Sequence, residues 1–234
     1  MLCVLLYPEN KVGFRRFAVS YTMKAILSLL CKIDCREYIK ALSINKPMLV
    51  IINHINFLEV PVLVAFSYPL YVTGLAKSET WKNPLFAFLF NTYKSIPIDR
   101  SGSFINSFKK VRDSVSNGVF TCIAPEGTRN KDGVLSKGKA GIIQLAAETN
   151  IPILPVAHYG GEKLWKNIKK LKRTNFVIKA GKPFFIKCEE RPCKEERESI
   201  MNEVMGQIAS LLPENMRGIY SLYAHKNCKY LDFI

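Results

Sequence analysis

Acidic residues are scarce in this chain, whose 234 residues include 19 Asp and Glu against 34 Lys and Arg, for a formal net charge of +15. The seven cysteines are an odd number without the dense pairing of a small secreted domain, which favours a reducing, cytosolic environment. Low-complexity tracts and internal repeats are also absent, while 48% of the residues are hydrophobic. These features exclude a disordered chain and a solenoid, and they predict a globular chain that acts near something anionic.

Several catalytic motifs are missing too. The sequence has no Gly-x-Ser-x-Gly elbow, so we do not expect a covalent intermediate on a serine of this kind. The only histidines, His54, His158 and His225, are far apart in sequence, and we expect no metal site. Residues 133–140 resemble a phosphate-binding P-loop, but Ala140 stands where that motif needs Ser or Thr to hold Mg²⁺. Nucleotide hydrolysis is therefore not expected.

The positive charge is concentrated in two regions. Residues 161–187 contain nine basic side chains and one acidic one, and the N-terminal region is also basic. Residues 14–31 include 12 apolar residues of 18, yet Lys24 lies near their middle. Because a lysine at the bilayer centre costs roughly 2.5–3.5 kcal/mol, this segment predicts an interfacial or re-entrant anchor, with a buried core helix as the alternative. Charge alone leaves nucleic acid open as the anionic partner.

The order of apolar runs indicates an α/β fold. Strand-like runs alternate with amphipathic helical patterns, which predicts a mixed sheet flanked by helices, with an N-terminal membrane-associating helical segment. The expected strands span 48–53, 70–73, 95–98, 119–124, 153–157 and 175–180, and the expected helices span 103–117, 140–149 and 200–211. We divide the chain into the N-terminal membrane-associating region 1–44, a catalytic domain 45–187 and a C-terminal helical extension 188–234.

The loop after the run 48–52 contains the first candidate site. Pro61 suits the first turn of the next helix, so His54 and Glu59 should both lie in the strand-to-helix connection, where the carboxylate can reach back to the imidazole. A histidine held through one ring nitrogen can accept a proton at the other, and such a base contributes roughly 10²–10⁴ in rate. A solvent-facing or capping role for these two residues is the alternative.

Three further loops have features of an anion site. Gly127 permits close backbone approach, while Thr128 and Arg129 offer donors suited to phosphate; an ordinary surface turn is the alternative. Arg100 follows the run 95–98 and could share the same anion. The run 153–157 leads to His158, which we interpret as a structural or rim histidine rather than a second base.

Four sequence blocks stand out when the loops are taken together: Asn53-His54-x4-Glu59, Ile96-Pro97-Ile98-Asp99-Arg100, Pro125-Glu126-Gly127-Thr128-Arg129 and Leu154-Pro155-Val156-Ala157. In this order they resemble the glycerolipid acyltransferase family typified by 1-acylglycerol-3-phosphate acyltransferases. The resemblance covers residues 45–185, and Lys139-Ala140-Gly141 also resembles a family feature. One position departs from the family, because Glu59 stands where its His-x4-Asp motif has Asp.

The resemblance implies an enzyme and assigns roles to these residues. His54 would deprotonate a hydroxyl and Glu59 would orient it. The acyl chain would pass from coenzyme A or an acyl carrier protein, as co-substrate and without a cofactor, to 1-acylglycerol 3-phosphate, giving phosphatidic acid. The residues implied to bind the substrate are Arg100, Glu126, Gly127, Thr128, Arg129 and Lys139.

Two alternatives remain for the function. The acceptor could be another lysolipid or glycerol 3-phosphate, or the chain could be a non-catalytic protein that binds anionic lipid or nucleic acid. We expect acyl transfer to 1-acylglycerol 3-phosphate rather than either alternative, with anionic membrane lipids rather than nucleic acid as partners. The expected location is the cytoplasmic face of a membrane, as a peripheral or monotopic protein.

Overall fold

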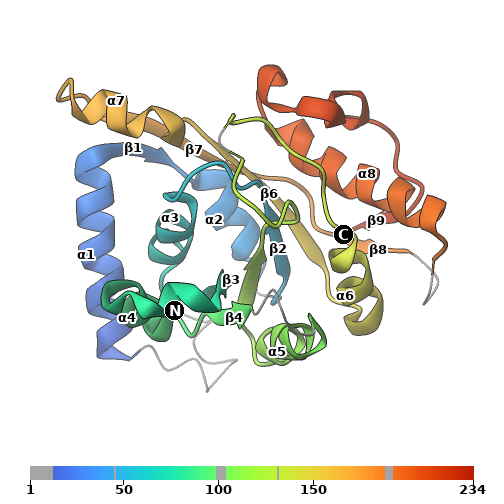
Figure 1. Cartoon of the computed structure of the whole chain (residues 1–234), viewed down its shortest axis with the longest axis horizontal. Helices are drawn as coiled ribbons and strands as arrows, with labels where there is room; N and C mark the ends of the chain where they lie inside the picture. Colours follow the sequence, from blue (N-terminus) through green and yellow to red (C-terminus); the bar gives the residue numbers. More distant parts are fainter. Residues whose placement is uncertain (1–12, 45, 99–103, 131, 188–191) are drawn as a thin grey trace.

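A computed structural model describes residues 13–44, 46–98, 104–130, 132–187 and 192–234. Within these ranges nine strands form one mixed sheet with helices on both faces (Figure 1). This confirms the predicted mixed sheet flanked by helices, while the membrane association of the N-terminal segment stays a prediction. The strands are β1 (Cys31–Asp34), β2 (Leu49–Ile52), β3 (Val72–Lys77), β4 (Ile96–Ile98), β5 (Phe120–Ile123), β6 (Ile153–Tyr159), β7 (Thr174–Ala180), β8 (Phe184–Ile186) and β9 (Leu231–Phe233). The α-helices are α1 (Phe14–Leu30), α2 (Arg36–Leu42), α3 (Glu59–Phe66), α4 (Pro84–Thr92), α5 (Phe104–Ser116), α6 (Gly141–Thr149), α7 (Leu164–Ile168) and α8 (Lys194–Leu211).

The strand order is β1-β7-β6-β2-β5-β3-β4, with β8 and β9 attached beside β6. The five strands β6, β2, β5, β3 and β4 are mutually parallel, whereas β7 runs antiparallel to β6. The carboxyl ends of β2, β5 and β6 therefore meet at one edge of the sheet. Loops at that edge are the expected place for a site in an open α/β sheet.

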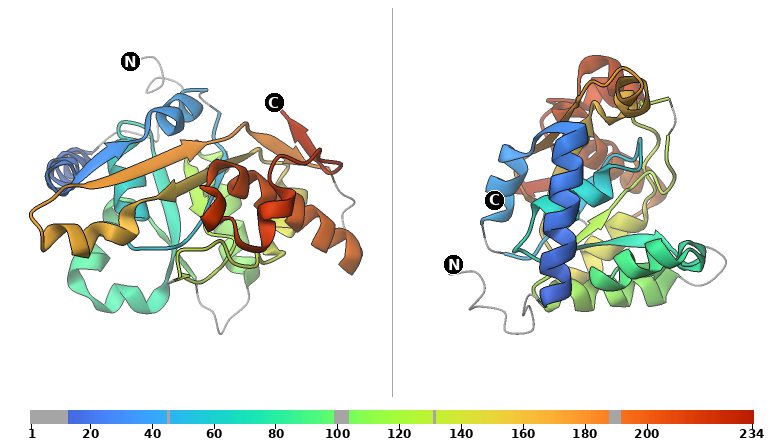
Figure 2. Two further views of the ribbon diagram at one scale, coloured as in Figure 1. Left: turned by 90° about the horizontal axis from the view of Figure 1, so that it is seen from above. Right: turned by 90° about the vertical axis from the view of Figure 1, so that its left-hand side faces the viewer.

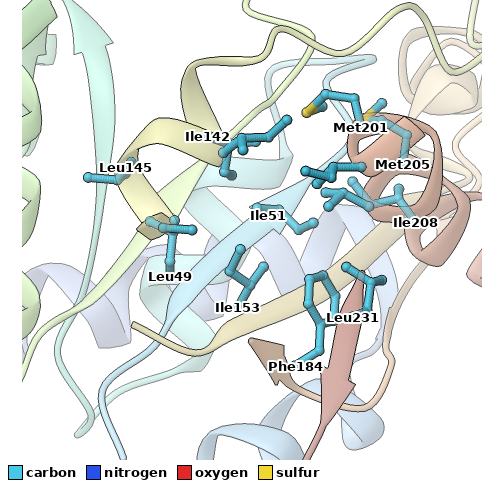
Figure 3. Close-up of a cluster of buried hydrophobic side chains, with 14 of the residues drawn as sticks. Leu49, Ile51, Ile142, Leu145, Ile153, Phe184, Met201, Met205, Ile208 and Leu231 are labelled. Carbon is cyan, nitrogen blue, oxygen red and sulfur yellow. The ribbon is translucent and has the colours of Figure 1, made fainter. Parts of the chain in front are cut away.

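The central strand β2 is buried on both faces, as expected for a parallel strand covered by helices. Leu49 and Ile51 point into a core shared with α5, α6 and α8, while Val50 and Ile52 point into the core beneath α1, α2 and α3. Figure 3 shows the first of these cores, in which Met201 and Met205 of α8 pack against the sheet. With both faces filled, β2 is a rigid base for the loop that follows it.

Helices α1 and α4 lie along one side of the molecule (Figures 1 and 2). The buried Arg16 of α1 donates to the carbonyls of Pro69 and Leu70, and Leu27 packs into the core, so α1 belongs to the globular unit. On its outer side α1 exposes Phe14, and α4 exposes three apolar side chains, Leu85, Phe86 and Phe88. No helix within the described residues is both long and apolar enough to cross a membrane.

The structure differs from the sequence prediction at several elements. The expected strand 70–73 is displaced to β3 (Val72–Lys77), and β1, β8 and β9 were not predicted. Of these, β1 and β9 lie in the segments 1–44 and 188–234, so both outer segments contribute a strand to the same sheet as the central segment. The three-part division of the chain stays a prediction.

Candidate active site

The loop between β2 and α3 brings His54 and Glu59 together. Glu59 is the first residue of α3, and its carboxylate Oε1 contacts Nδ1 of His54 as the sequence predicts. Asn56 stabilises the connection through an Asx turn, in which its Oδ1 accepts from the backbone N–H of Leu58 at 2.8 Å. The His54 side chain keeps 25% of its surface exposed, against 2% for Glu59. The imidazole is therefore the half of this pair that can meet a substrate.

Glu59 is an ionised carboxylate within the protein. Its Oε2 lies 3.0 Å from Nε2 of His158 and 3.3 Å from the backbone nitrogen of Asn56. Burial by itself would raise the pKa of Glu59, but hydrogen bonds from His158 and His54 outweigh it and lower the pKa to about 2. Its place at the N-terminus of α3 also suits a negative charge. Glu59 thus fixes the proton of His54 on Nδ1 and leaves Nε2 as the acceptor.

The loop after β5 holds the backbone of His54 from the other side. The His54 N–H donates to Oε1 of Glu126 at 2.7 Å, and the His54 carbonyl accepts from the backbone N–H of Asn130 at 2.8 Å. Oε2 of Glu126 accepts from the backbone N–H of Ser136 at 2.8 Å. Only 2% of Glu126 is exposed. Its carboxylate therefore ties the loop between β2 and α3 to a second part of the connection between β5 and α6. Its predicted contact with substrate stays a prediction.

The side chain of Lys139 packs against Gly127, the residue that follows Glu126. Gly127 has a φ of +69°, and a methyl group in place of its hydrogen would lie 2.8 Å from Nζ of Lys139. The backbone N–H of Lys139 donates to the carbonyl of Pro125 at 2.9 Å, which fixes the two ends of the connection between β5 and α6 against each other. Within the described part of the chain, Lys139 forms no ion pair with a carboxylate. Its ammonium group lies over the glycine turn and is available to an anion.

The other predicted substrate-binding residues differ in what the structure says of them. Thr128 and Arg129 are exposed in the loop after β5, next to Gly127. Arg100 lies outside the described residues, although β4, the strand before it, ends at the same edge of the sheet as β2 and β5. No cluster of three metal-ligating side chains occurs within the ranges that the structure describes.

Sequence reasoning did not assign functions to Asn53 or Ser136, which support the site from the same loops that hold His54 and Glu126. Asn53 pairs with the backbone of His158: its Nδ2 donates to the His158 carbonyl at 3.0 Å, and its Oδ1 accepts from the His158 N–H at 2.8 Å. These partners are separated by 105 positions in sequence. Only the place of Asn53 directly before His54 could have pointed to it.

These loops bring a histidine–carboxylate pair and exposed basic side chains to one edge of a helix-flanked mixed sheet. The sequence model of the Acyltransferase family matches residues 32–159, which include His54, Glu59 and the loop after β5. The chain therefore belongs to the Acyltransferase family.

Two plant proteins show the similarity in sequence. The chain is 31% identical over 185 residues to the 1-acyl-sn-glycerol-3-phosphate acyltransferase of Cocos nucifera, covering 76% of this chain and 58% of that protein. It is 24% identical over 203 residues to the chloroplastic 1-acyl-sn-glycerol-3-phosphate acyltransferase BAT2 of Brassica napus, covering 84% and 58%. The chain thus spans a little over half the length of these relatives.

A solved structure shows the similarity in fold. The crystal structure of the 1-acyl-sn-glycerophosphate acyltransferase PlsC from Thermotoga maritima superimposes with a TM-score of 0.59 at 20% identity, covering 81% of this chain and 76% of that one. This likeness supports the mixed α/β sheet with its flanking helices.

Proposed function

We propose that this protein transfers an acyl chain from a thioester to the free hydroxyl of 1-acylglycerol 3-phosphate, giving phosphatidic acid. The observation that carries the proposal is the contact of His54 Nδ1 with the buried, ionised carboxylate of Glu59. That contact leaves the exposed side of the imidazole free to take a proton from an alcohol. The names of the two plant relatives and their similarity to this chain support the same reaction.

The proposed reaction needs one base and one anion site. As Nε2 of His54 removes the hydroxyl proton, the oxygen attacks the thioester carbonyl and a C–O bond forms. The tetrahedral oxyanion then collapses, the C–S bond breaks, and the thiolate leaves with a proton from the imidazolium. No covalent acyl-enzyme is required, and no cofactor takes part.

The connection between β5 and α6 supplies the proposed seat for the acceptor phosphate. Arg129 offers a planar guanidinium for bidentate contact, and Lys139 adds a point charge close to the Gly127 turn. We include Thr128 and Arg100 in this seat on the strength of the family resemblance.

An acyl-transfer assay over several acceptors and donors tests the proposed reaction. The acceptors are 1-acylglycerol 3-phosphate, glycerol 3-phosphate and 1-acylglycerophosphoethanolamine, each offered with acyl coenzyme A and with acyl carrier protein, and released thiol and lipid product are both measured. We expect the highest kcat/KM with 1-acylglycerol 3-phosphate. Preference for another acceptor would retain acyl transfer but reassign the substrate, and thiol release without lipid product would contradict the proposal.

We further propose that the protein binds the cytoplasmic face of an anionic membrane as a peripheral protein, through the outer sides of α1 and α4. On α4, Leu85, Phe86 and Phe88 are 63%, 45% and 46% exposed. The guanidinium of Arg15 on α1 lies 5.9 Å from the centre of the Phe88 ring, so positive charge borders this apolar surface. Apolar side chains edged with basic ones suit the interface of an anionic bilayer.

Vesicle flotation tests this surface with a matched control. Replacing Leu85, Phe86 and Phe88 with serine should reduce binding to vesicles that contain anionic lipid by at least fivefold. The control replaces Ile219 and Leu222 with serine, two side chains that are 64% and 77% exposed elsewhere on the molecule. Equal loss in both variants would contradict the assignment, and binding that duplex DNA displaces at moderate salt would favour a nucleic-acid partner.

A further inference from the structure

His158 is a second histidine on the carboxylate of Glu59. It lies in β6, its side chain is fully buried, and its ring stacks on Phe176 with centroids 5.5 Å apart. Sequence reasoning left it as a structural or rim residue, and its burial shows that it does not line the rim. Its burial and its contact with Glu59 also exclude a role as a base that meets substrate directly.

The contacts of His158 determine which ring nitrogen carries a proton. Nε2 lies 3.0 Å from Oε2 of Glu59 and 3.0 Å from the backbone carbonyl of Asn53. Both partners only accept, so Nε2 must carry the hydrogen and donate it. Nδ1 is buried and has no hydrogen-bond partner in the described part of the chain. The imidazole thus acts as a donor toward Glu59.

The backbone of His158 is held as firmly as its ring. Asn53 accepts from the His158 N–H and donates to the His158 carbonyl, so the first residue after β2 pairs with the end of β6. A donor fixed in this way sets the position of Oε2. The other oxygen of Glu59 is then left for His54.

The length of Glu59 fits this arrangement. The resemblance described above places Asp at this position in the family, whereas the side chain here is one methylene longer. Glu59 bridges two imidazoles, with one carboxylate oxygen on each. We propose that His158 is a positioning residue for acyl transfer, matched to the glutamate at position 59, which holds Oε2 so that Oε1 orients the base; this rests on the proposed function.

Kinetics of three variants test the proposal. His158→Phe keeps the volume and stacking but loses the donor, and we expect kcat to fall about tenfold while KM for acceptor and donor stays within twofold. His158→Gln, which can place an amide N–H near the position of Nε2, should recover at least a third of the wild-type kcat. The control Thr121→Val removes a buried hydroxyl of β5 that bonds to Ser114 rather than to Glu59, and it should leave kcat within twofold.

A double-mutant cycle tests the match between the two residues. Because aspartate at position 59 is too short to reach both imidazoles, His158→Phe should change kcat less than twofold in the Glu59→Asp background. An equal fall in both backgrounds would overturn the proposal. So would a His158→Phe enzyme as active as the wild type, or a His158→Gln enzyme as impaired as His158→Phe.

The four proteins of this cycle, which are the wild type, His158→Phe, Glu59→Asp and the double variant, are also unfolded with urea at pH 7. This measurement separates the pairing of the two residues from the proposed function. If the pair exists, the shifts of the unfolding midpoint are non-additive whether or not the protein turns over substrate. A wild type that transfers no acyl group to any acceptor contradicts the function alone. Additive midpoint shifts contradict the pairing alone.

Discussion

The backbone N–H of His54 donates to Oε1 of Glu126 at 2.7 Å, across 72 positions of sequence. Through this bond the loop after β5 fixes the residue that we propose as the base. The other oxygen of the same carboxylate accepts from the backbone N–H of Ser136. One buried side chain therefore sets the position of the loop that contains His54 relative to the connection between β5 and α6.

Replacing Glu126 with glutamine should loosen the site. The carboxylate accepts a backbone N–H at each oxygen, whereas an amide has one oxygen, so one N–H would face the NH₂ group. An unsatisfied buried donor costs about 1–3 kcal/mol, and we expect urea unfolding to show this loss, together with a fall in kcat of about tenfold. The control is Ser136→Ala, which removes only the hydroxyl and should cost less than half as much. A Glu126→Gln protein with wild-type stability and kcat would show that the link is unimportant.

Gly127→Ala should weaken acceptor binding through Lys139. The new methyl group would lie 2.8 Å from Nζ and 2.9 Å from Cε of Lys139, which forces the ammonium group away from the turn. The φ of +69° adds about 1–2 kcal/mol of backbone strain. Gly133→Ala is a matched control, because Gly133 has a φ of +73° with open space around it. We expect KM for the acceptor to rise at least fivefold in Gly127→Ala only; equal effects in both variants would contradict the role of Lys139.

Arg129→Ala should reduce the discrimination between acceptors with and without phosphate. We expect the ratio of kcat/KM for 1-acylglycerol 3-phosphate over 1-acylglycerol to fall about tenfold, because in the proposed site the guanidinium would contact only the phosphate. The ratio for Arg129→Lys should lie between those of the wild type and Arg129→Ala, since an ammonium group keeps the charge but lacks the bidentate fork. The control Arg197→Ala removes an exposed arginine of α8. An unchanged ratio in Arg129→Ala would remove this residue from the acceptor site.

Part of the stability of the protein should depend on the ionisation of Glu59. Its pKa in the folded state, about 2, lies below its ordinary value of 4.5. The folded protein therefore binds fewer protons at this residue than the unfolded chain does between these values. The stabilisation, on the order of 3 kcal/mol, is complete above pH 4.5 and is lost as the pH falls toward 2.

Urea unfolding at pH 5 and pH 3 measures this dependence. The free energy of unfolding should fall less between these two pH values in Glu59→Gln than in the wild type. The exposed Glu195 of α8, changed to glutamine, is the control and should retain the wild-type difference. The same fall in all three proteins would mean that Glu59 is not held as an ion.

The elements nearest the site could be read from the sequence, because their patterns are strong. The run 48–52 is apolar throughout, and it forms β2, whose residues are buried on both faces. Pro61 marked the first turn of the next helix, and this correctly predicted that Glu59 can reach back to His54. In the same way, an apolar run followed by a glycine located β5 and the turn at Gly127. In each case a short-range pattern was enough to fix the local structure.

The remaining parts depend on contacts that no local pattern contains. The short strand β9 exists because its residues pair with β8, which lies more than forty positions earlier. β3 extends to Lys77 because its last three residues pair with β4, although Gly74 and Lys77 are poor strand formers. The sequence predicted His158 as a structural or rim histidine, and only the side-by-side arrangement of β2 and β6 brings it to Glu59.

The most direct measurement is kcat for acyl transfer by His54→Asn, with His225→Asn as the matched control. His225 is exposed and has a φ of +68°, a backbone conformation that asparagine tolerates well. If the imidazole at position 54 removes the hydroxyl proton, kcat should fall by roughly 10²–10⁴ in His54→Asn and stay within twofold in His225→Asn. A folded His54→Asn protein that retains more than a tenth of the wild-type kcat would contradict the assignment of His54 as the base.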